Sequence, residues 1–122
     1  MSAQTIVETF LRTLERRDMA GARAFTAPGF VMIFPGGRRF TSLEELVAWS
    51  GTRSRKTRKV IERFDEIQSA NGATVYCVGT LEGEWPDGAP FNGIRFVDRF
   101  VVEGGRIVEQ RVWNDLAELR RP

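Results

Sequence analysis

The segment Gly93-Ile94-Arg95-Phe96-Val97-Asp98-Arg99-Phe100-Val101-Val102 places an acid within an alternating apolar pattern. Side chains two positions apart share one face of a β-strand, so Asp98 shares its face with Ile94, Phe96, Phe100 and Val102. An ionised carboxylate on an apolar face is costly unless a partner satisfies it. Asp98 is therefore either a pocket residue with a role in binding or chemistry, or a structural acid with a hidden partner.

The rest of the sequence predicts helices first and long strands after them. We expect a helix over 3–17 and a second short helix after Asp18, which Ala27-Pro28-Gly29 terminates. A third helix is expected from Ser42 to about Trp49 or Ser50. Short strands are expected over 30–34 and 38–41, and longer ones over 58–68, 73–85, 91–103 and 106–114. Asp115-Leu116-Ala117-Glu118 is interpreted as the capping box of a short last helix. This order indicates an α+β domain with helices on one face of an antiparallel sheet.

Length and composition restrict the chemistry. The 122 residues suit one domain spanning 1–122, and the chain has no histidine. The absence of histidine excludes Ser–His and Cys–His catalysis, and the single Cys77, expected to be buried, excludes a cysteine zinc site. Acid–base chemistry must therefore come from Asp, Glu, Tyr or Lys, and we expect neither a metal nor an organic cofactor.

Charge and hydropathy give expectations about partners and location. No apolar run approaches the roughly 18 residues that span a bilayer, and the N-terminus lacks a signal-peptide pattern, so we expect a cytoplasmic protein without a membrane partner. The basic residues concentrate in one run, Arg53, Arg55, Lys56, Arg58 and Lys59. We interpret it as a solvated loop leading into an edge strand; the alternative is a phosphate or nucleic-acid contact. No aromatic residue interleaves the run for base stacking, so no nucleic-acid partner is expected.

Several motifs together resemble a known family. They are Arg17-Asp18-Met19, Ala27-Pro28-Gly29-Phe30, Pro35-Gly36-Gly37, Phe96-Val97-Asp98-Arg99-Phe100 and Trp113-Asn114-Asp115-Leu116. The chain resembles, over nearly its whole length, the SnoaL-like branch of the nuclear transport factor 2-like superfamily, which has the ketosteroid isomerase-like fold. The resemblance implies a strongly curved sheet wrapped around helices as a cone with an internal pocket. It also implies a homodimer through the outer sheet face, which would carry Tyr76, Arg95, Val97, Arg99, Arg111 and Trp113.

The resemblance also implies what the chain lacks. Asp98 falls where ketosteroid isomerases have their protonated, oxyanion-stabilising aspartate, but their other two catalytic groups would fall on Phe34 and Phe10. The positions that match the limonene epoxide hydrolase machinery read Gly79, Leu81 and Val112. Scytalone dehydratase-type chemistry uses histidine. None of these three known mechanisms is therefore expected.

The register of the last hairpin decides which side chains share a face with Asp98. A three-residue loop, Glu103-Gly104-Gly105, puts Val108, Gln110, Val112 and Asn114 on that face, whereas a two-residue loop, Gly104-Gly105, puts Arg111 and Trp113 there. The family pattern favours the first register. The expected pocket then contains Phe10, Leu14, Met32, Phe34, Trp49, Cys77, Gly79, Leu81, Phe96, Asp98, Gln110, Val112 and Asn114.

Two functions remain open from the sequence. The first is a small-molecule pocket enzyme of isomerase, cyclase or dehydratase type, acting on an apolar carbonyl or hydroxyl compound. Asp98 would act as acid or acid–base, because apolar neighbours raise the pKa of a carboxyl, and Gln110 and Asn114 would anchor the ligand. The second is a non-catalytic dimeric ligand-binding or accessory domain. A second titratable group within reach of Asp98 would favour the enzyme.

Overall fold

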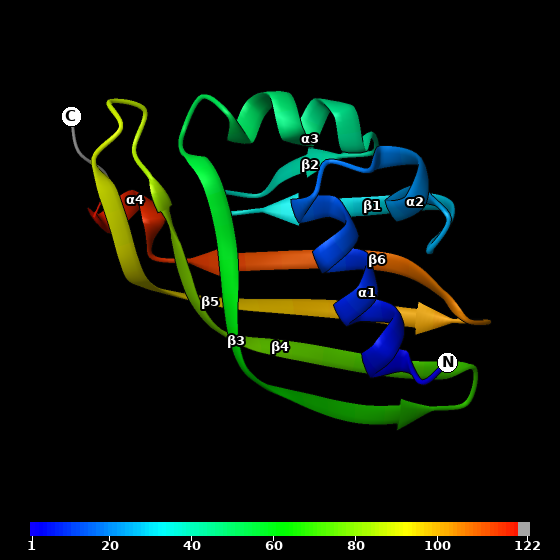
Figure 1. The fold of residues 1–122 in the computed structure, drawn as a ribbon. Coiled ribbons are helices and arrows are strands. Elements are labelled where there is room, and N and C mark those ends of the chain that lie inside the picture. Colours follow the sequence, from blue (N-terminus) through cyan, green and yellow to red (C-terminus); the bar gives the residue numbers. More distant parts are fainter. Residues whose placement is uncertain (120–122) are drawn as a thin grey trace.

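The computed structural model describes residues 1–119. Four helices and six strands make up this part of the chain (Figure 1). In chain order they are α1 (Ala3–Glu15), α2 (Met19–Arg23), β1 (Thr26–Phe34), β2 (Arg38–Phe40), α3 (Leu43–Ser50), β3 (Arg55–Ser69), β4 (Gly72–Glu84), β5 (Pro90–Glu103), β6 (Arg106–Asn114) and α4 (Leu116–Leu119).

The strands form a single curved sheet in the order β2-β1-β6-β5-β4-β3. Neighbouring strands run antiparallel except β1 and β6, which run parallel. Figure 1 shows α1 lying across one face of this sheet, with the long strand β3 bending around its edge. The predicted α+β architecture, a curved sheet with helices on one face, is confirmed.

Helix α1 begins at a side-chain cap and buries one apolar stripe against the sheet. The Ser2 side chain accepts a hydrogen bond from the Thr5 backbone N–H, which satisfies one of the free amides of the first turn. Ile6, Val7 and Phe10 recur at helical spacing and are buried. The Phe10 ring packs edge-on against Phe30 and Phe100, at centroid distances of 6.0 and 6.2 Å. Sheet and helix therefore share one core.

The last hairpin reaches the expected register by an unexpected route. Its loop is only Gly104-Gly105, both with positive φ, because Glu103 pairs with Arg106. A two-residue loop alone would turn the wrong face of β6 inward. An extra residue, Val108, corrects this, since Val102 pairs with Ile107 and Val101 with Glu109. The predicted three-residue loop is wrong, but Asp98 still pairs with Val112 and shares its face with Gln110.

The same bulge changes one predicted core residue. Val108 was expected on the Asp98 face, but it occupies the bulge and is half-buried, whereas Ile107 is fully buried. Strand β1 also differs from expectation, because pairing begins at Thr26 and continues past Ala27-Pro28-Gly29. The pairing of β1 with β6 shifts register between Thr26 and Val31, and Gly29 has φ 79° there. The residues predicted to terminate the second helix therefore form an irregularity within the strand.

The short helix α4 is capped by a different residue from the one predicted. The Asn114 side chain accepts a hydrogen bond from the Leu116 backbone N–H at 3.0 Å. The Asp115 carboxylate instead pairs with Arg95 at 2.6 Å. The interpretation of Asp115 as the side-chain cap is therefore wrong, and the Asn114 amide is committed to the backbone.

Candidate functional site

The hidden partner of Asp98 is Lys59. Its Nζ forms a close ion pair with Asp98 Oδ2, and it also lies 5.0 Å from the centroid of the Phe96 ring. Asp98 is fully buried, and 17% of the Lys59 side chain is exposed. The expectation that the basic run is entirely solvated is therefore wrong at this position. An ammonium close to a carboxylate and to an aromatic face is held by two attractive contacts.

Strand alternation explains why Lys59 points inward while its basic neighbours do not. Thr57, Lys59 and Ile61 are partly buried, whereas Arg58 and Val60 between them are exposed. In a strand, alternate side chains face opposite sides of the sheet, so Lys59 lies in phase with Ile61. This period-two pattern is present in the sequence and could have identified the lysine.

Helix α1 fixes the backbone of Lys59 with two charged side chains. Arg12 donates a hydrogen bond from Nη1 to the Lys59 carbonyl oxygen at 2.9 Å, and the Lys59 N–H donates to Glu15 Oε2 at 2.8 Å. Arg12 and Glu15 also pair with each other at 3.0 Å. Because both backbone groups of Lys59 are held, its side chain is directed from a fixed origin toward Asp98.

Gln110 completes a buried polar cluster, which we call the inner cluster: Lys59, Asp98 and Gln110. Gln110 Nε2 donates to Asp98 Oδ2 over 3.5 Å, and both residues are buried. Asp98 Oδ1 and Gln110 Oε1 are buried without a hydrogen-bond partner among residues 1–119. Buried acceptors usually have a donor, so each of these two acceptors is an atom that a hydroxyl or amine hydrogen of a ligand would satisfy.

Burial decides the direction of the Asp98 titration. Removal of the carboxyl from water raises its pKa above the ordinary 3.8, although the Lys59 charge and the hydrogen bonds from Lys59 and Gln110 lower it. Burial also raises the pKa of the Cys77 thiol, which lies opposite Asp98 on β4, to about 12. Cys77 is therefore an unreactive apolar neighbour at neutral pH.

A small cavity of about 110 Å³ reaches the inner cluster from α1 and α3. Its walls are largely apolar, and the polar residues Lys59 and Gln110 are among those that line it. Asp98 does not line the cavity, but it contacts Lys59 and Gln110, which do. The apolar lining consists of Leu11, Leu14, Phe34, Leu46 and Val47, and the remaining lining residues are Glu15, Arg17, Ser50 and Thr57.

The predicted pocket residues separate into several groups. Phe34, Leu14 and Gln110 line the cavity. Trp49 lies one layer further out, with its ring 5.7 Å from that of Phe34 and the guanidinium groups of Arg38 and Arg53 over it at 5.2 and 4.9 Å. Phe10, Met32, Cys77, Leu81, Phe96 and Val112 are buried in the core, whereas Gly79 and Asn114 line a different hollow.

The outer sheet face carries a second hollow, of about 550 Å³. Arg95, Val97 and Trp113, all expected on this face, line it, and 51% of Trp113 is exposed. Tyr76, Arg99 and Arg111 lie opposite one another on β4, β5 and β6. The arrangement of these side chains fits the predicted outer face, and the homodimer stays a prediction.

Comparison with known proteins identifies the fold family. The sequence profile of the SnoaL-like domain matches residues 7–110. No curated protein matches the chain. Among the described residues, no helix has the length and apolar character needed to cross a membrane.

Solved structures share the fold at low sequence identity. A nuclear transport factor 2-like protein of unknown function from Burkholderia pseudomallei has a TM-score of 0.77 and 23% identity, covering 95% of this chain and 92% of that one. TerC, co-crystallised with polyporic acid, has a TM-score of 0.78 and 18% identity, covering 94% and 92%. A candidate polyketide cyclase from Pseudomonas putida has a TM-score of 0.74 and 16% identity, covering 98% and 96%. The chain thus belongs to the SnoaL-like domain family, and its fold is that of the nuclear transport factor 2-like proteins.

Proposed function

We propose that this chain binds a small carbonyl or hydroxyl compound in the cavity and acts on it by acid–base chemistry of the isomerase, cyclase or dehydratase type. The observation that carries the proposal is the inner cluster, a buried ion pair with two unpartnered acceptors, two of whose residues, Lys59 and Gln110, line an apolar cavity. A second titratable group beside Asp98 was the feature that would favour an enzyme, and Lys59 is that group. Solved relatives that include TerC and a candidate polyketide cyclase support the same class.

The roles follow from which atoms meet the cavity. Lys59 lines it, so its Nζ is placed to donate a hydrogen bond to a ligand oxygen and to stabilise negative charge that develops there. Asp98 lies behind Lys59 and takes part through it, balancing its charge and fixing its direction. Gln110 Oε1, which is buried and has no hydrogen-bond partner among residues 1–119, is assigned as the acceptor for a ligand hydroxyl. Lys59 thus takes the position against the ligand that the sequence assigned to Asp98.

Cavity size restricts the part of the ligand that enters. A cavity of about 150 Å³ holds a benzene molecule, and this one measures about 110 Å³. The enclosed group is therefore smaller than an aromatic ring, such as a short ketone or a branched alcohol. A larger ligand would place only one end against Lys59 and Gln110.

The second candidate function is a non-catalytic dimeric ligand-binding or accessory domain. The observation that favours it is the outer sheet face, where the half-exposed Trp113 borders a hollow larger than the cavity. Aromatic and arginine side chains are enriched at protein–protein interfaces. Both candidates share the same fold and the same inner cluster, and they differ in whether a bound compound is turned over.

Proton exchange at carbon separates the two candidates. We would incubate butanone and acetoin with the protein in deuterated buffer and follow loss of the α-proton signals by NMR. Acceleration by the wild-type protein, reduced about 100-fold or more in Lys59→Met, supports acid–base catalysis. Arg63→Met, which removes an exposed cation from the same strand, is the matched control. Saturable binding without exchange supports the accessory domain. If neither butanone nor acetoin binds, the result contradicts the ligand pocket.

A further inference from the structure

Two residues other than glycine within 1–119 have a left-handed backbone, Arg17 at φ 62° and Lys56 at φ 53°. They lie far apart in sequence, one after α1 and one in β3. Both line the same surface hollow of about 460 Å³, together with Glu15, Thr57 and Arg58. We call this hollow the vestibule. Strained backbone often concentrates at functional sites, so its coincidence with a shared hollow directs attention there.

Glycine would suit both backbone positions better. Arg17 follows the C-cap Arg16 of α1, at the position where left-handed glycine ends many helices. Lys56 lies in an irregular part of β3, where the pairing with β4 shifts between Arg55 and Arg58. Two long cationic side chains are therefore present at positions where the backbone conformation favours glycine.

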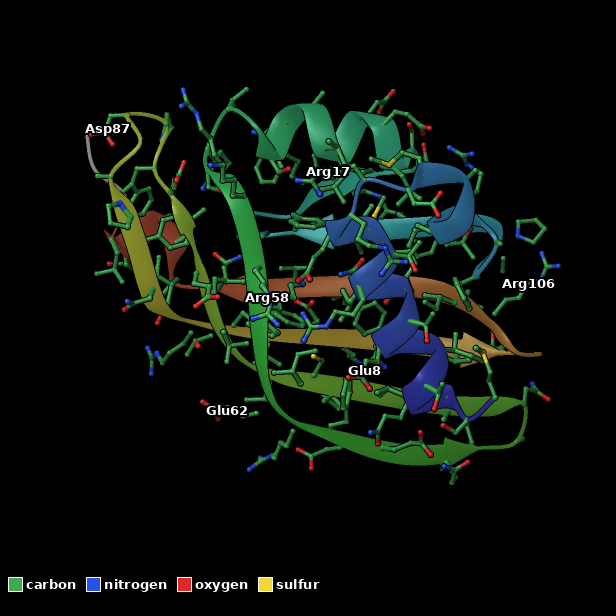
Figure 2. All side chains as sticks on the ribbon, viewed as in Figure 1. Glu8, Arg17, Arg58, Glu62, Asp87 and Arg106 are labelled. Atoms are coloured by element: carbon green, nitrogen blue, oxygen red, sulfur yellow. The ribbon has the colours of Figure 1, made fainter. Side chains whose placement is uncertain are left out.

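The vestibule is the mouth of the cavity. Glu15, Arg17 and Thr57 line both the vestibule and the cavity that leads to the inner cluster. In Figure 2, Arg17 follows α1 and Arg58 lies on β3, whereas Arg106 lies at the far end of the sheet. A compound that enters the cavity from this side passes these cations.

The residues that line the vestibule include three cations and one acid, whereas the inner cluster has one cation and one acid. Arg17, Lys56 and Arg58 face Glu15, whose carboxylate already accepts from Arg12 and from the Lys59 N–H. Two further acids lie nearby: Glu84 at 3.6 Å from Lys56 and Glu82 at 3.5 Å from Arg58, in largely exposed pairs. Exposed pairs of this kind are weak and leave cations open to a competing anion.

We propose that the vestibule recognises the carboxylate of the ligand while a short apolar body carrying a carbonyl or hydroxyl enters the cavity. This rests on the proposed function, since it assigns the neutral end of the ligand to Lys59 and Gln110. The opposite orientation would bury a third charge beside the already balanced Lys59–Asp98 pair, which is unfavourable. The ligand class is therefore a short oxo- or hydroxycarboxylic acid.

Matched acid and amide probes test the carboxylate directly. We would titrate the protein with levulinate and with levulinamide, which share the ketone and differ in charge, and follow backbone amide shifts by NMR. At about 0.01 M salt we expect levulinate to bind about tenfold more tightly. The difference should shrink at about 0.1 M salt, where the Debye length falls from about 30 Å to about 10 Å.

The double variant Arg17→Gly/Lys56→Gly removes two cations with a residue that the backbone accepts. We expect the preference for levulinate to disappear, levulinamide binding to stay within about twofold, and the melting temperature not to fall. The control Arg39→Gln/Arg106→Gln removes the same net charge from exposed positions outside the vestibule and should keep the preference.

The outcomes distinguish this inference from the proposed function. Equal binding of acid and amide, with both weakened by Lys59→Met, overturns the carboxylate assignment and leaves the ligand pocket intact. A preference for levulinate that survives Arg17→Gly/Lys56→Gly also overturns it. A lower melting temperature of that variant would mean that the two side chains serve the fold, which contradicts the inference. Absence of binding by both probes contradicts the pocket and the inference together.

Discussion

Lys59 and Asp98 form an ion pair across two strand spacings, because Lys59 lies on β3, Asp98 on β5, and β4 runs between them. The curvature of the sheet brings the edge strand over the interior, so a long lysine side chain reaches the acid on the concave side. The pair closes the inner end of the cavity, and it is the main determinant of what the site can do.

Removal of one member of this pair should destabilise the protein more than removal of both. Asp98→Ala leaves the largely buried Lys59 ammonium without its partner, and we expect a loss of about 3 kcal/mol in the free energy of unfolding. Lys59→Met/Asp98→Leu replaces both charges with apolar side chains and should lie within about 1 kcal/mol of the wild type. Urea denaturation measures both. A double variant less stable than Asp98→Ala would contradict this account.

Stability should fall as pH rises through the acidic range on account of Asp98. Its pKa is raised in the folded state, so above 3.8 the folded protein retains a proton that the unfolded chain has lost. Under proton linkage, this contribution is fully present below 3.8 and is lost as pH rises through the folded-state pKa. The difference in unfolding free energy between wild type and Asp98→Asn should therefore decline from pH about 4 upward. A difference that is flat or increases with pH would show that burial does not control this carboxyl.

Gly79→Ala should disrupt the edge strand. A Cβ at Gly79 would lie 2.0 Å from the carbonyl oxygen of Val60, where β3 has an irregularity between Ile61 and Arg63. Backbone atoms cannot yield as a flexible side chain can, so we expect a loss of about 3 kcal/mol or unpairing of β3. Thr80→Ala, on the same strand, is the control and should cost less than about 1 kcal/mol. Circular dichroism melts would compare the two, and equal melting temperatures would contradict the prediction.

Arg17→Gly alone should stabilise the protein. It relieves a left-handed backbone that costs an arginine about 1 kcal/mol, so the melting temperature should rise by about 3 °C. Arg17→Ala keeps the strained backbone and should give no such rise. Differential scanning calorimetry of the three proteins measures the effect. A rise with alanine equal to that with glycine would locate the gain in charge removal instead of the backbone.

The outer sheet face predicts the oligomeric state. We expect a homodimer in solution and a monomer for Trp113→Arg, since an exposed tryptophan at the hollow would be replaced by a hydrated charge. Light scattering coupled to gel filtration gives the mass directly. Glu8→Arg, an exposed charge change on α1, should leave the mass unchanged. A monomeric wild-type protein would remove the support for the dimeric accessory domain.

Local sequence patterns predicted most of the fold because each pattern depends on near neighbours. The alternation around Asp98 identified its strand and its inward direction. The Ser42 capping box identified the start of α3, where the Glu45 N–H donates a hydrogen bond to the Ser42 hydroxyl at 3.2 Å. The Val108 bulge was missed because an extra residue in a strand leaves no distinctive composition. The family pattern still gave the correct face.

The centre of the site was only half predictable. Asp98 and Gln110 follow from alternation, but Lys59 was read with its basic neighbours as a solvated run. Alternation with Ile61 indicates that Lys59 points inward, but its contact with Asp98 depends on long-range geometry, namely the bend of β3 over the interior and the hydrogen bonds from Arg12 and to Glu15 that fix its backbone. The vestibule could not be predicted, because positive φ at Arg17 and Lys56 leaves no trace in residue type.

The hold of α1 on Lys59 also affects association between molecules. An edge strand presents free amide and carbonyl groups that can template pairing with a strand from another chain. At Lys59 both groups are already hydrogen-bonded to Glu15 and Arg12, so the helix blocks strand addition in the first third of β3. Detachment of α1 would therefore release Lys59 from its fixed position and expose unpaired backbone groups of the edge strand at the same time. Loss of the binding site is thus linked to the first step of aggregation.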